Sequence, residues 1–191
     1  MKVSQADILV LPGLGGGERN HWYDRWSEKL KTARRVDGMD WSKNGPEPVL
    51  EDWIERIVRA VEQAGQPVVL IGHSLGALAA AHAAPRFPHL KVAGGYLVAP
   101  PDIDMLRARH PEHDRMTAAF NPAPTAPLPF PSILVASRND PYSTFEKAED
   151  LSFAWGAKLE SAGDSGHINA ESGQGPWPEG LLSFANFMAR L

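Results

Sequence analysis

The 191-residue sequence contains no cysteine. It therefore cannot form a disulfide framework, a thiol nucleophile, a cysteine-ligated zinc site or a thioredoxin-type redox centre. It also lacks a strong excess of one charge, because 19 lysine and arginine residues stand against 23 aspartate and glutamate residues, for a net charge of -4. There is no long basic run, which is the electrostatic footprint of a nucleic-acid-binding protein, so we expect no nucleic-acid partner.

Long hydrophobic runs are missing as well. The first apolar stretch, residues 8–11, ends at Pro12. A signal peptide needs an apolar core of roughly 7–15 residues, and a spanning helix needs about 20. We therefore expect no membrane association and a cytoplasmic protein, which the absence of cysteine also fits.

The composition is that of a folded protein, with 43% hydrophobic and 22% charged residues. A chain of this length buries roughly 70% of the surface that its unfolded form exposes, so a core can form without covalent staples. We expect a single domain over residues 1–191. The 17 glycines and 17 prolines mark breaks between segments, and candidate chemical groups stand at these breaks.

Four short runs are apolar without interruption and end at a glycine, a proline or a polar cluster. Because they do not alternate between apolar and polar residues, they are typical of strands buried on both faces in a parallel sheet. Two weaker segments, 34–39 and 157–161, bring the expected strands to about six. The four strong runs are residues 8–11, 68–71, 96–99 and 133–136.

Helical periodicity fills the intervals between these strands. Over residues 49–61 apolar side chains recur every three or four positions, and Gly65 ends the pattern. Ser143 and Glu146 stand at capping-box spacing and predict the start of another helix. This alternation predicts an α/β three-layer sandwich with a mostly parallel sheet. Further helices are expected over residues 22–30, 75–84 and 178–191.

The run at residues 68–71 leads directly into Gly72-His73-Ser74-Leu75-Gly76, followed by an alanine-rich helical stretch. A G-x-S-x-G sequence between a buried strand and a helix is typical of a nucleophile elbow, where a strained turn exposes the serine hydroxyl. The flanking glycines are needed because neighbouring backbone comes close. We therefore predict that Ser74 is a nucleophile. A glycine-rich turn that merely contains a serine is the structural alternative.

A serine hydroxyl needs a base and an orienting acid, and this architecture places them after later strands in the order serine, acid, histidine. Asp140 directly follows the run at residues 133–136, and His167 lies in a glycine-rich loop after the last expected strand. We predict that these two residues complete a triad with Ser74. Asp164, Asp102 and Asp104 remain alternative acids.

The other histidines fit structural roles better. His73 lies inside the turn and should point away from the hydroxyl of the next residue. His82 stands on the following helix, where a core or half-buried position is expected, and His89 lies in a connector. His110 and His113 lack the H-E-x-x-H spacing of a zinc site, so we expect a solvated loop there and no metal.

The first strand ends in a glycine-rich loop over residues 13–17. It matches neither a dinucleotide fingerprint, since Glu18 replaces the third glycine, nor a phosphate-binding loop. A hydrolase of this type needs two backbone N–H groups aimed at an oxyanion, and we predict that Leu14 and Leu75 supply them. His21 and Trp41 are candidate substrate-binding residues at the mouth of a pocket.

Trp22 follows His21 and is expected to pack at the junction of the loop and the helix. Residues 121–131 hold five prolines and are expected to form a stiff connector. The whole interval 100–131 is where larger hydrolases carry a lid, but about thirty residues can form only a small cover.

Three segments, residues 72–76, 137–142 and 166–169, resemble those of the small α/β-hydrolases related to retinoblastoma-binding protein 9 and its bacterial relatives. The resemblance spans residues 7–190 and implies a minimal α/β-hydrolase fold with serine-hydrolase activity. The name-giving partner is not expected, because retinoblastoma binding is attributed to an L-x-C-x-E motif and the chain has no cysteine.

These observations predict a serine hydrolase that cleaves an ester or related acyl bond of a small-molecule substrate through an acyl-enzyme intermediate. A carboxylesterase-like activity is expected, and thioesterase or peptidase activity stays open because one triad serves all three. Neither a cofactor nor a metal is expected. The alternative is a catalytically idle relative that binds a partner or a small molecule.

Overall fold

The computed structural model describes residues 1–16, 20–39 and 49–191. These residues hold a six-stranded sheet in the order β2-β1-β3-β4-β5-β6, and every pair of neighbouring strands is parallel. The expected mostly parallel sheet is therefore confirmed. Its strands are β1 (Asp7–Leu11), β2 (Ala33–Arg35), β3 (Val68–His73), β4 (Val92–Val98), β5 (Ser132–Ala136) and β6 (Lys158–Ser161).

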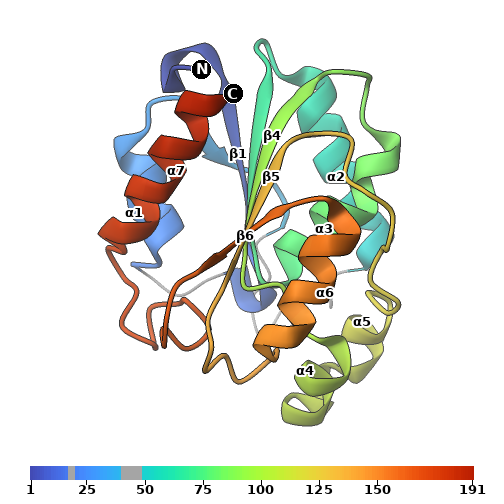
Figure 1. Ribbon diagram of the computed structural model, residues 1–191. Coiled ribbons are helices and arrows are strands. Elements are labelled where there is room, and N and C mark those ends of the chain that lie inside the picture. The colour runs from blue at the N-terminus through green and yellow to red at the C-terminus, as the bar shows by residue number, and fades with distance from the viewer. Residues whose placement is uncertain (17–19, 40–48) are drawn as a thin grey trace.

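Helices cover both faces of the sheet and complete three layers (Figure 1). Helices α1 (Trp22–Lys29) and α7 (Pro178–Arg190) lie on one face, and α2 (Leu50–Gln63), α3 (Leu75–Ala83) and α6 (Phe145–Trp155) lie on the other. All six residues of β3 are buried, because this strand lies inside the sheet and is covered by both layers. This arrangement is a minimal α/β-hydrolase fold.

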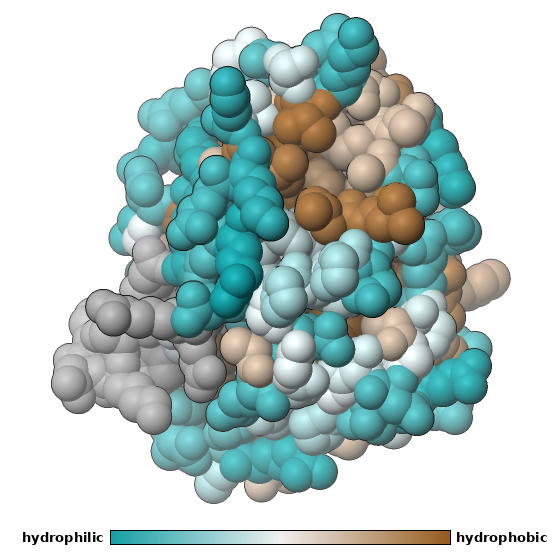
Figure 2. All heavy atoms as spheres, turned by 90° about the vertical axis from the view of Figure 1, so that its left-hand side faces the viewer, coloured by the Kyte–Doolittle hydropathy of each residue, from teal (hydrophilic) through white to brown (hydrophobic). Residues whose placement is uncertain are grey.

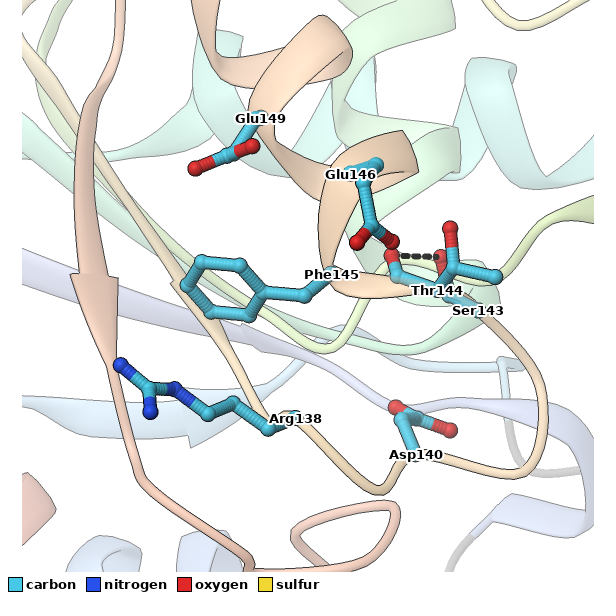
Figure 3. A pocket seen from close by; sticks show the side chains of 7 residues that line it. All are labelled: Arg138, Asp140, Ser143, Thr144, Phe145, Glu146 and Glu149. Carbon is cyan, nitrogen blue, oxygen red and sulfur yellow. Dashed lines mark hydrogen bonds between the residues drawn. The ribbon is translucent and has the colours of Figure 1, made fainter.

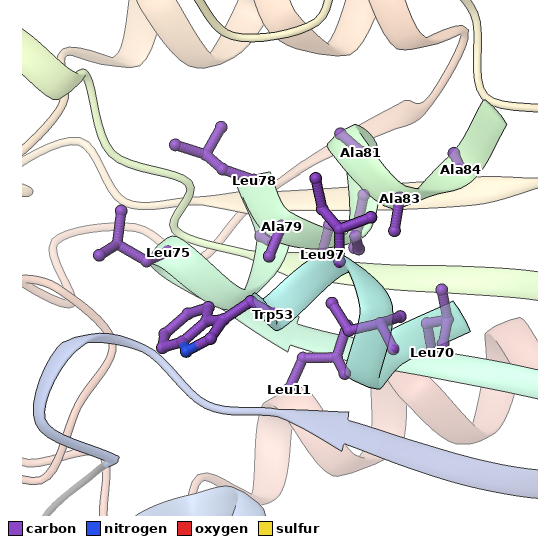
Figure 4. Close-up of a cluster of buried hydrophobic side chains, with 14 of the residues drawn as sticks. Leu11, Trp53, Leu70, Leu75, Leu78, Ala79, Ala81, Ala83, Ala84 and Leu97 are labelled. Atoms are coloured by element: carbon purple, nitrogen blue, oxygen red, sulfur yellow. The ribbon is translucent and has the colours of Figure 1, made fainter. Parts of the chain in front are cut away.

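The larger hydrophobic cluster lies between the sheet and helices α2 and α3. Helix α3 is buried on nearly all sides, and its alanines let it approach both the sheet and α2 (Figure 4). Trp53 of α2 packs beside Leu75 and Leu11 in this cluster. Close packing here fixes the position of the first turn of α3, which directly follows Ser74.

The opposite face carries a second cluster rich in aromatic rings, with Trp22, Trp26 and Trp177 among its members. The rings of Trp26 and Trp177 stack with their centroids 5.6 Å apart. On the outer surface of this side, hydrophobic residues gather in a small patch surrounded by hydrophilic ones (Figure 2). This aromatic layer supports the loop that carries His167, as described below.

Two strand boundaries differ from the expectation. The strand expected over residues 34–39 is shorter and earlier, because β2 lies at the edge of the sheet and pairs only with β1. Strand β4 begins at Val92 rather than near Tyr96. Gly94 and Gly95 interrupt its apolar run because a Cβ on either would press on Phe187 or Phe130.

The interval 100–131 contains more regular structure than expected. Helices α4 (Ile103–Arg109) and α5 (Asp114–Ala118) flank a 3-10 turn, Pro111–His113. The segment around His110 is therefore solvated as expected, with every residue of 110–114 at least partly exposed, but it is not the expected loop. Residues 121–131 form no helix or strand, as expected for a proline-rich connector. Both short helices lie near α6, beside the end of the sheet where the strands finish (Figure 1).

Helix α6 begins one residue later than the capping-box spacing indicated. Thr144, not Ser143, is the N-cap, and its hydroxyl accepts a hydrogen bond from the Lys147 N–H at 3.2 Å. Ser143 is buried instead, and its hydroxyl is directed to the Thr144 carbonyl at 3.3 Å. Within the described residues, no helix combines the length and apolar character needed to cross a bilayer.

Candidate active site

Ser74 occupies a sharp turn between β3 and α3. Its φ of 54° is positive, a conformation that costs free energy for any residue other than glycine. The turn is so tight that it has no room for side chains beside the serine. A Cβ on Gly72 would lie 2.8 Å from the Ala77 Cα, and one on Gly76 would overlap the Leu11 carbonyl. The two glycines of the G-x-S-x-G sequence are therefore required by close backbone approach.

A continuous chain of hydrogen bonds joins the three predicted residues. The Ser74 Oγ lies 2.9 Å from the Nε2 of His167, and the Nδ1 of His167 lies 2.9 Å and 3.0 Å from the two carboxylate oxygens of Asp140. All three residues are buried. Serine, histidine and carboxylate thus stand in the order and at the distances that proton transfer from the hydroxyl to the imidazole requires.

Residues of the loop after β5 fix the positions of the acid and the base relative to each other. The Tyr142 N–H donates to Asp140 Oδ1 at 2.8 Å and leaves that carboxylate facing His167. The carboxamide oxygen of Asn139 accepts from the Gly166 N–H at 2.7 Å, and the Ser137 hydroxyl accepts from the Ser165 N–H at 2.9 Å. The loop that carries Asp140 is therefore tied directly to the loop that carries His167.

The alternative acids lie elsewhere. Asp164 is exposed although it shares the loop of His167. Asp102 is the N-cap of α4, where its carboxylate accepts from the N–H groups of Asp104 and Met105. Asp104 is exposed on the same helix. Asp140 is the one of these four carboxylates that contacts His167 in the described residues.

Two backbone N–H groups border the serine. Leu75 is the first residue of α3, so its N–H belongs to the group of amides that a helix leaves unbonded at its start. The loop after β1 lies on the other side, because a Cβ on Gly13 would lie 2.8 Å from the Ser74 Cβ. Leu14 follows Gly13 and begins a 3-10 turn, Leu14–Gly16. Strands β1 and β3 are neighbours where the strand order reverses, which is where α/β sheets place ligands.

Of the predicted pocket-mouth residues, His21 is covered by protein. Its imidazole stacks on the Tyr23 ring with centroids 3.8 Å apart and meets His73 at 4.7 Å. Trp22 packs as expected, fully buried, and its indole N–H donates to the Ile168 carbonyl at 2.8 Å. Trp41 lies outside the described residues. A role for His21 or Trp41 toward substrate stays a prediction.

Burial keeps the imidazoles of His21 and His73 neutral. It lowers the pKa of His21 from 6.5 to about 3, and electrostatic interactions with Arg35 and His167 act in the same direction. Burial also holds the pKa of His73 well below its ordinary value, again with His21 and His167 contributing and a backbone hydrogen bond to His167 opposing. Folding therefore lowers the proton affinity of both imidazole rings.

This burial predicts that the folded state loses stability in acid. Below about pH 6.5 the unfolded chain binds protons at His21 and His73 that the folded chain does not, so the free energy of unfolding falls as pH falls. Each group contributes at most about 1.4 kcal/mol per pH unit, over a window that for His21 extends down to about pH 3. Urea titrations between pH 7.5 and 4.5 measure this slope.

A matched pair of variants isolates the effect. His21→Gln should flatten the pH dependence, while His89→Gln, at an exposed histidine, should leave the slope unchanged. If His21→Gln and the parent lose stability equally between pH 6.5 and 4.5, the folded state does not exclude the proton at His21.

Sequence reasoning missed Tyr142 as part of the site. Its ring meets the His167 ring edge-on with centroids 4.6 Å apart, and its hydroxyl lies 3.0 Å from the Nε2 of His110. Through His110, which caps the end of α4, the short helices after β4 contact the residues around the imidazole. Tyr142 belongs to segment 137–142, which carries the family resemblance, but no spacing rule marks an aromatic ring that packs against a catalytic imidazole.

A hollow of about 610 Å³ borders Asp140 (Figure 3). Arg138 and the ring of Phe145 approach one another across it, with the guanidinium 5.8 Å from the ring centroid. Glu146 and Glu149 of α6 line the same hollow. The described residues that line it do not include Ser74 or His167, so this hollow is not where an acyl group would meet the serine.

Comparison with known proteins shows the family of this chain. The sequence model of the family described as serine hydrolase matches residues 8–186. A YdeN-like hydrolase from Pectobacterium atrosepticum is 34% identical, with 97% of this chain and 92% of that chain covered and a TM-score of 0.80. The comparison with curated proteins gives no match.

Two more distant structures share the fold. The ydeN gene product of B. subtilis is 17% identical, with a TM-score of 0.70 over 97% of this chain and 99% of that chain. The esterase domain of a Rhodothermus marinus protein is 20% identical, with a TM-score of 0.64 over 93% of this chain and 84% of that chain.

Proposed function

The chain belongs to the serine hydrolase family, and from this premise we propose that it hydrolyses an ester or related acyl bond with Ser74 as its nucleophile. The observation that carries the proposal is the 2.9 Å contact between the Ser74 Oγ and the His167 Nε2, made at a strained turn in front of a helix. A hydroxyl held in this way is one proton transfer from being a strong nucleophile.

In the first half of the reaction, the Ser74 Oγ attacks the acyl carbon while the Nε2 of His167 takes the hydroxyl proton. Asp140 accepts a hydrogen bond from Nδ1–H, which selects the tautomer with a free Nε2 and stabilises the imidazolium that forms. His167 then gives the proton to the leaving oxygen, the bond to the alcohol breaks, and an acyl-serine remains.

In the second half, water replaces the alcohol. His167 takes a proton from the water, the hydroxide adds to the acyl-serine, and the proton returns to the Ser74 Oγ as the acid leaves. Both halves pass through a tetrahedral oxyanion. The N–H groups of Leu75 and Leu14 are proposed to stabilise it, each contributing about 3 kcal/mol in the transition state.

Small uncharged acyl compounds are the proposed substrate class, because the sequence offers no basic cluster that would bind a phosphate or a polyanion. Carboxylic esters are proposed first, because an alcohol is a better leaving group than an amine. Thioesters and amides use the same groups. No step of this reaction requires a metal or an organic cofactor.

Covalent labelling tests the proposal directly. The protein is incubated with a small alkyl fluorophosphonate and analysed by intact mass and by peptide mapping. We expect one adduct, on Ser74, that fails to form in Ser74→Ala and in heat-denatured protein. A folded protein that stays unlabelled under conditions that label an authentic serine esterase would contradict the proposal and favour an idle member of the fold.

A further inference from the structure

His73, the residue before the serine, makes contacts with three separate segments. Its side chain is buried on the face of the sheet covered by α1 and α7, together with Ile71 of the same strand. Its ring lies 4.7 Å from the His21 ring and 5.0 Å from the His167 ring, measured between centroids. On the side of the first loop, a Cβ on Gly13 would lie 3.4 Å from its Nδ1.

One of these contacts is a hydrogen bond to the backbone of the predicted base. The Nε2 of His73 lies 3.0 Å from the carbonyl oxygen of His167. A carbonyl only accepts, so Nε2 must carry the hydrogen. The ring is also neutral at pH 7, since burial holds the pKa of His73 well below its ordinary value. Its single hydrogen is therefore on Nε2, and Nδ1 is unprotonated.

The backbone around His167 needs such support. His167 stands between Gly166, with a φ of 56°, and Ile168, with a φ of 49°. A positive φ is strained for a β-branched residue such as isoleucine, and it persists only where surrounding contacts hold it. Each of the three residues is held by a side chain from elsewhere: Asn139 binds the Gly166 N–H, His73 the His167 carbonyl and Trp22 the Ile168 carbonyl.

Among these three supports, His73 differs in being covalently joined to the nucleophile. Asn139 comes from the loop after β5 and Trp22 from α1, so each fixes the His167 loop relative to another part of the protein. His73 links that loop to the peptide unit adjacent to Ser74 itself. One hydrogen bond and one peptide bond therefore connect the His167 backbone to Ser74.

We propose that His73 is a positioning residue that sets the distance between the Ser74 Oγ and the His167 Nε2 by donating its Nε2–H to the backbone carbonyl of His167. This proposal rests on the proposed function, because it assigns His73 a role in the same reaction. A displacement of about 1 Å between reacting groups lowers a rate by about 100-fold. The hydrogen bond therefore acts on kcat, while ground-state binding of a substrate, and hence KM, depends on it little.

Two substitutions at this position separate the hydrogen bond from the volume of the ring. His73→Leu fills the space without a donor, and we expect kcat for a p-nitrophenyl ester to fall by ~10–100-fold with KM within threefold of the parent. His73→Gln carries an amide N–H that reaches the place of Nε2, and it should keep kcat within about fivefold. Circular dichroism and thermal melting establish that each variant is folded.

His82 provides the matched control. Its Nε2 also bonds a backbone carbonyl, that of Phe120 at 3.3 Å, but it lies on α3 away from the reacting groups. His82→Leu should cost stability and leave kcat within twofold of the parent. A folded His73→Leu that keeps kcat within threefold overturns the proposal, as does a folded His73→Gln that is as slow as His73→Leu.

A measurement on the unmodified protein covers the case in which the variants do not fold. Two-dimensional ¹⁵N NMR of the imidazole groups at pH 7 should show His73 as the neutral Nε2–H tautomer, and a proton on Nδ1 instead overturns the proposal. Failure of the proposed function is distinguishable, because the parent protein would then show neither esterase activity nor labelling by fluorophosphonate.

Discussion

Ser74→Ala should lower kcat for ester hydrolysis by about 10³-fold or more, with a melting temperature close to that of the parent. The loss is large because the acyl-enzyme route needs the hydroxyl, and only binding and the oxyanion N–H groups remain to assist water. The fold should persist because the backbone groups of Ser74, not its hydroxyl, make the structural contacts: its N–H donates to the Val98 carbonyl, and its carbonyl accepts from the Ala77 N–H.

Ser132→Ala is the control for removal of a buried serine hydroxyl. Ser132 starts β5, and its Oγ donates to the Phe130 carbonyl at 3.2 Å, away from the His167 imidazole. This variant should lose some stability and keep its kcat. Steady-state kinetics on p-nitrophenyl acetate, with calorimetry of both variants, measures the two effects. A Ser74→Ala protein within tenfold of the parent would show that another group starts the reaction.

The sheet could be predicted because its strands carry a local signal. In a parallel sheet covered on both faces, both sides of a strand must be apolar, and this produces uninterrupted runs such as residues 68–71. The helices that cover the sheet carry the complementary periodicity, most clearly in α2. Both signals arise from burial within one element, so they can be read without knowing its neighbours.

What the sequence did not predict depends on contacts between distant segments. Helices α4 and α5 have seven and five residues, too few for a periodic pattern, and Asp102 at the start of α4 was considered as a possible catalytic acid rather than as a cap. The early start of β4 at Val92 was hidden by Gly94 and Gly95, whose small size reflects packing against α7 and the connector before β5.

The same distinction holds at the candidate site. Ser74, Asp140 and His167 were marked by position, because each lies in the turn or loop that follows a predicted strand. The roles of His73 and Asn139 are not local: the hydrogen bond of His73 to the His167 carbonyl spans 94 residues, and that of Asn139 to the Gly166 N–H spans 27. A side chain that supports a loop from elsewhere in the chain has no spacing to reveal it.

Asp140→Asn should be nearly as damaging as Ser74→Ala, with kcat reduced by about 10³-fold. Both carboxylate oxygens of Asp140 face Nδ1 of His167, and Oδ1 also accepts from the Tyr142 N–H. An asparagine that keeps its oxygen on the Tyr142 N–H must turn its NH₂ group toward Nδ1. The imidazole then places its hydrogen on Nε2, where it can no longer take the proton of Ser74, and no carboxylate stabilises the imidazolium.

Asp164→Asn is the matched control, since Asp164 shares the His167 loop but is exposed and separated from the imidazole. It should retain kcat within about threefold. Steady-state kinetics of the two variants, with fluorophosphonate labelling rates, compares them on the same step. If Asp164→Asn were the damaged protein and Asp140→Asn the mild one, the acid that orients His167 during turnover would be Asp164, and the loop would have to rearrange for catalysis.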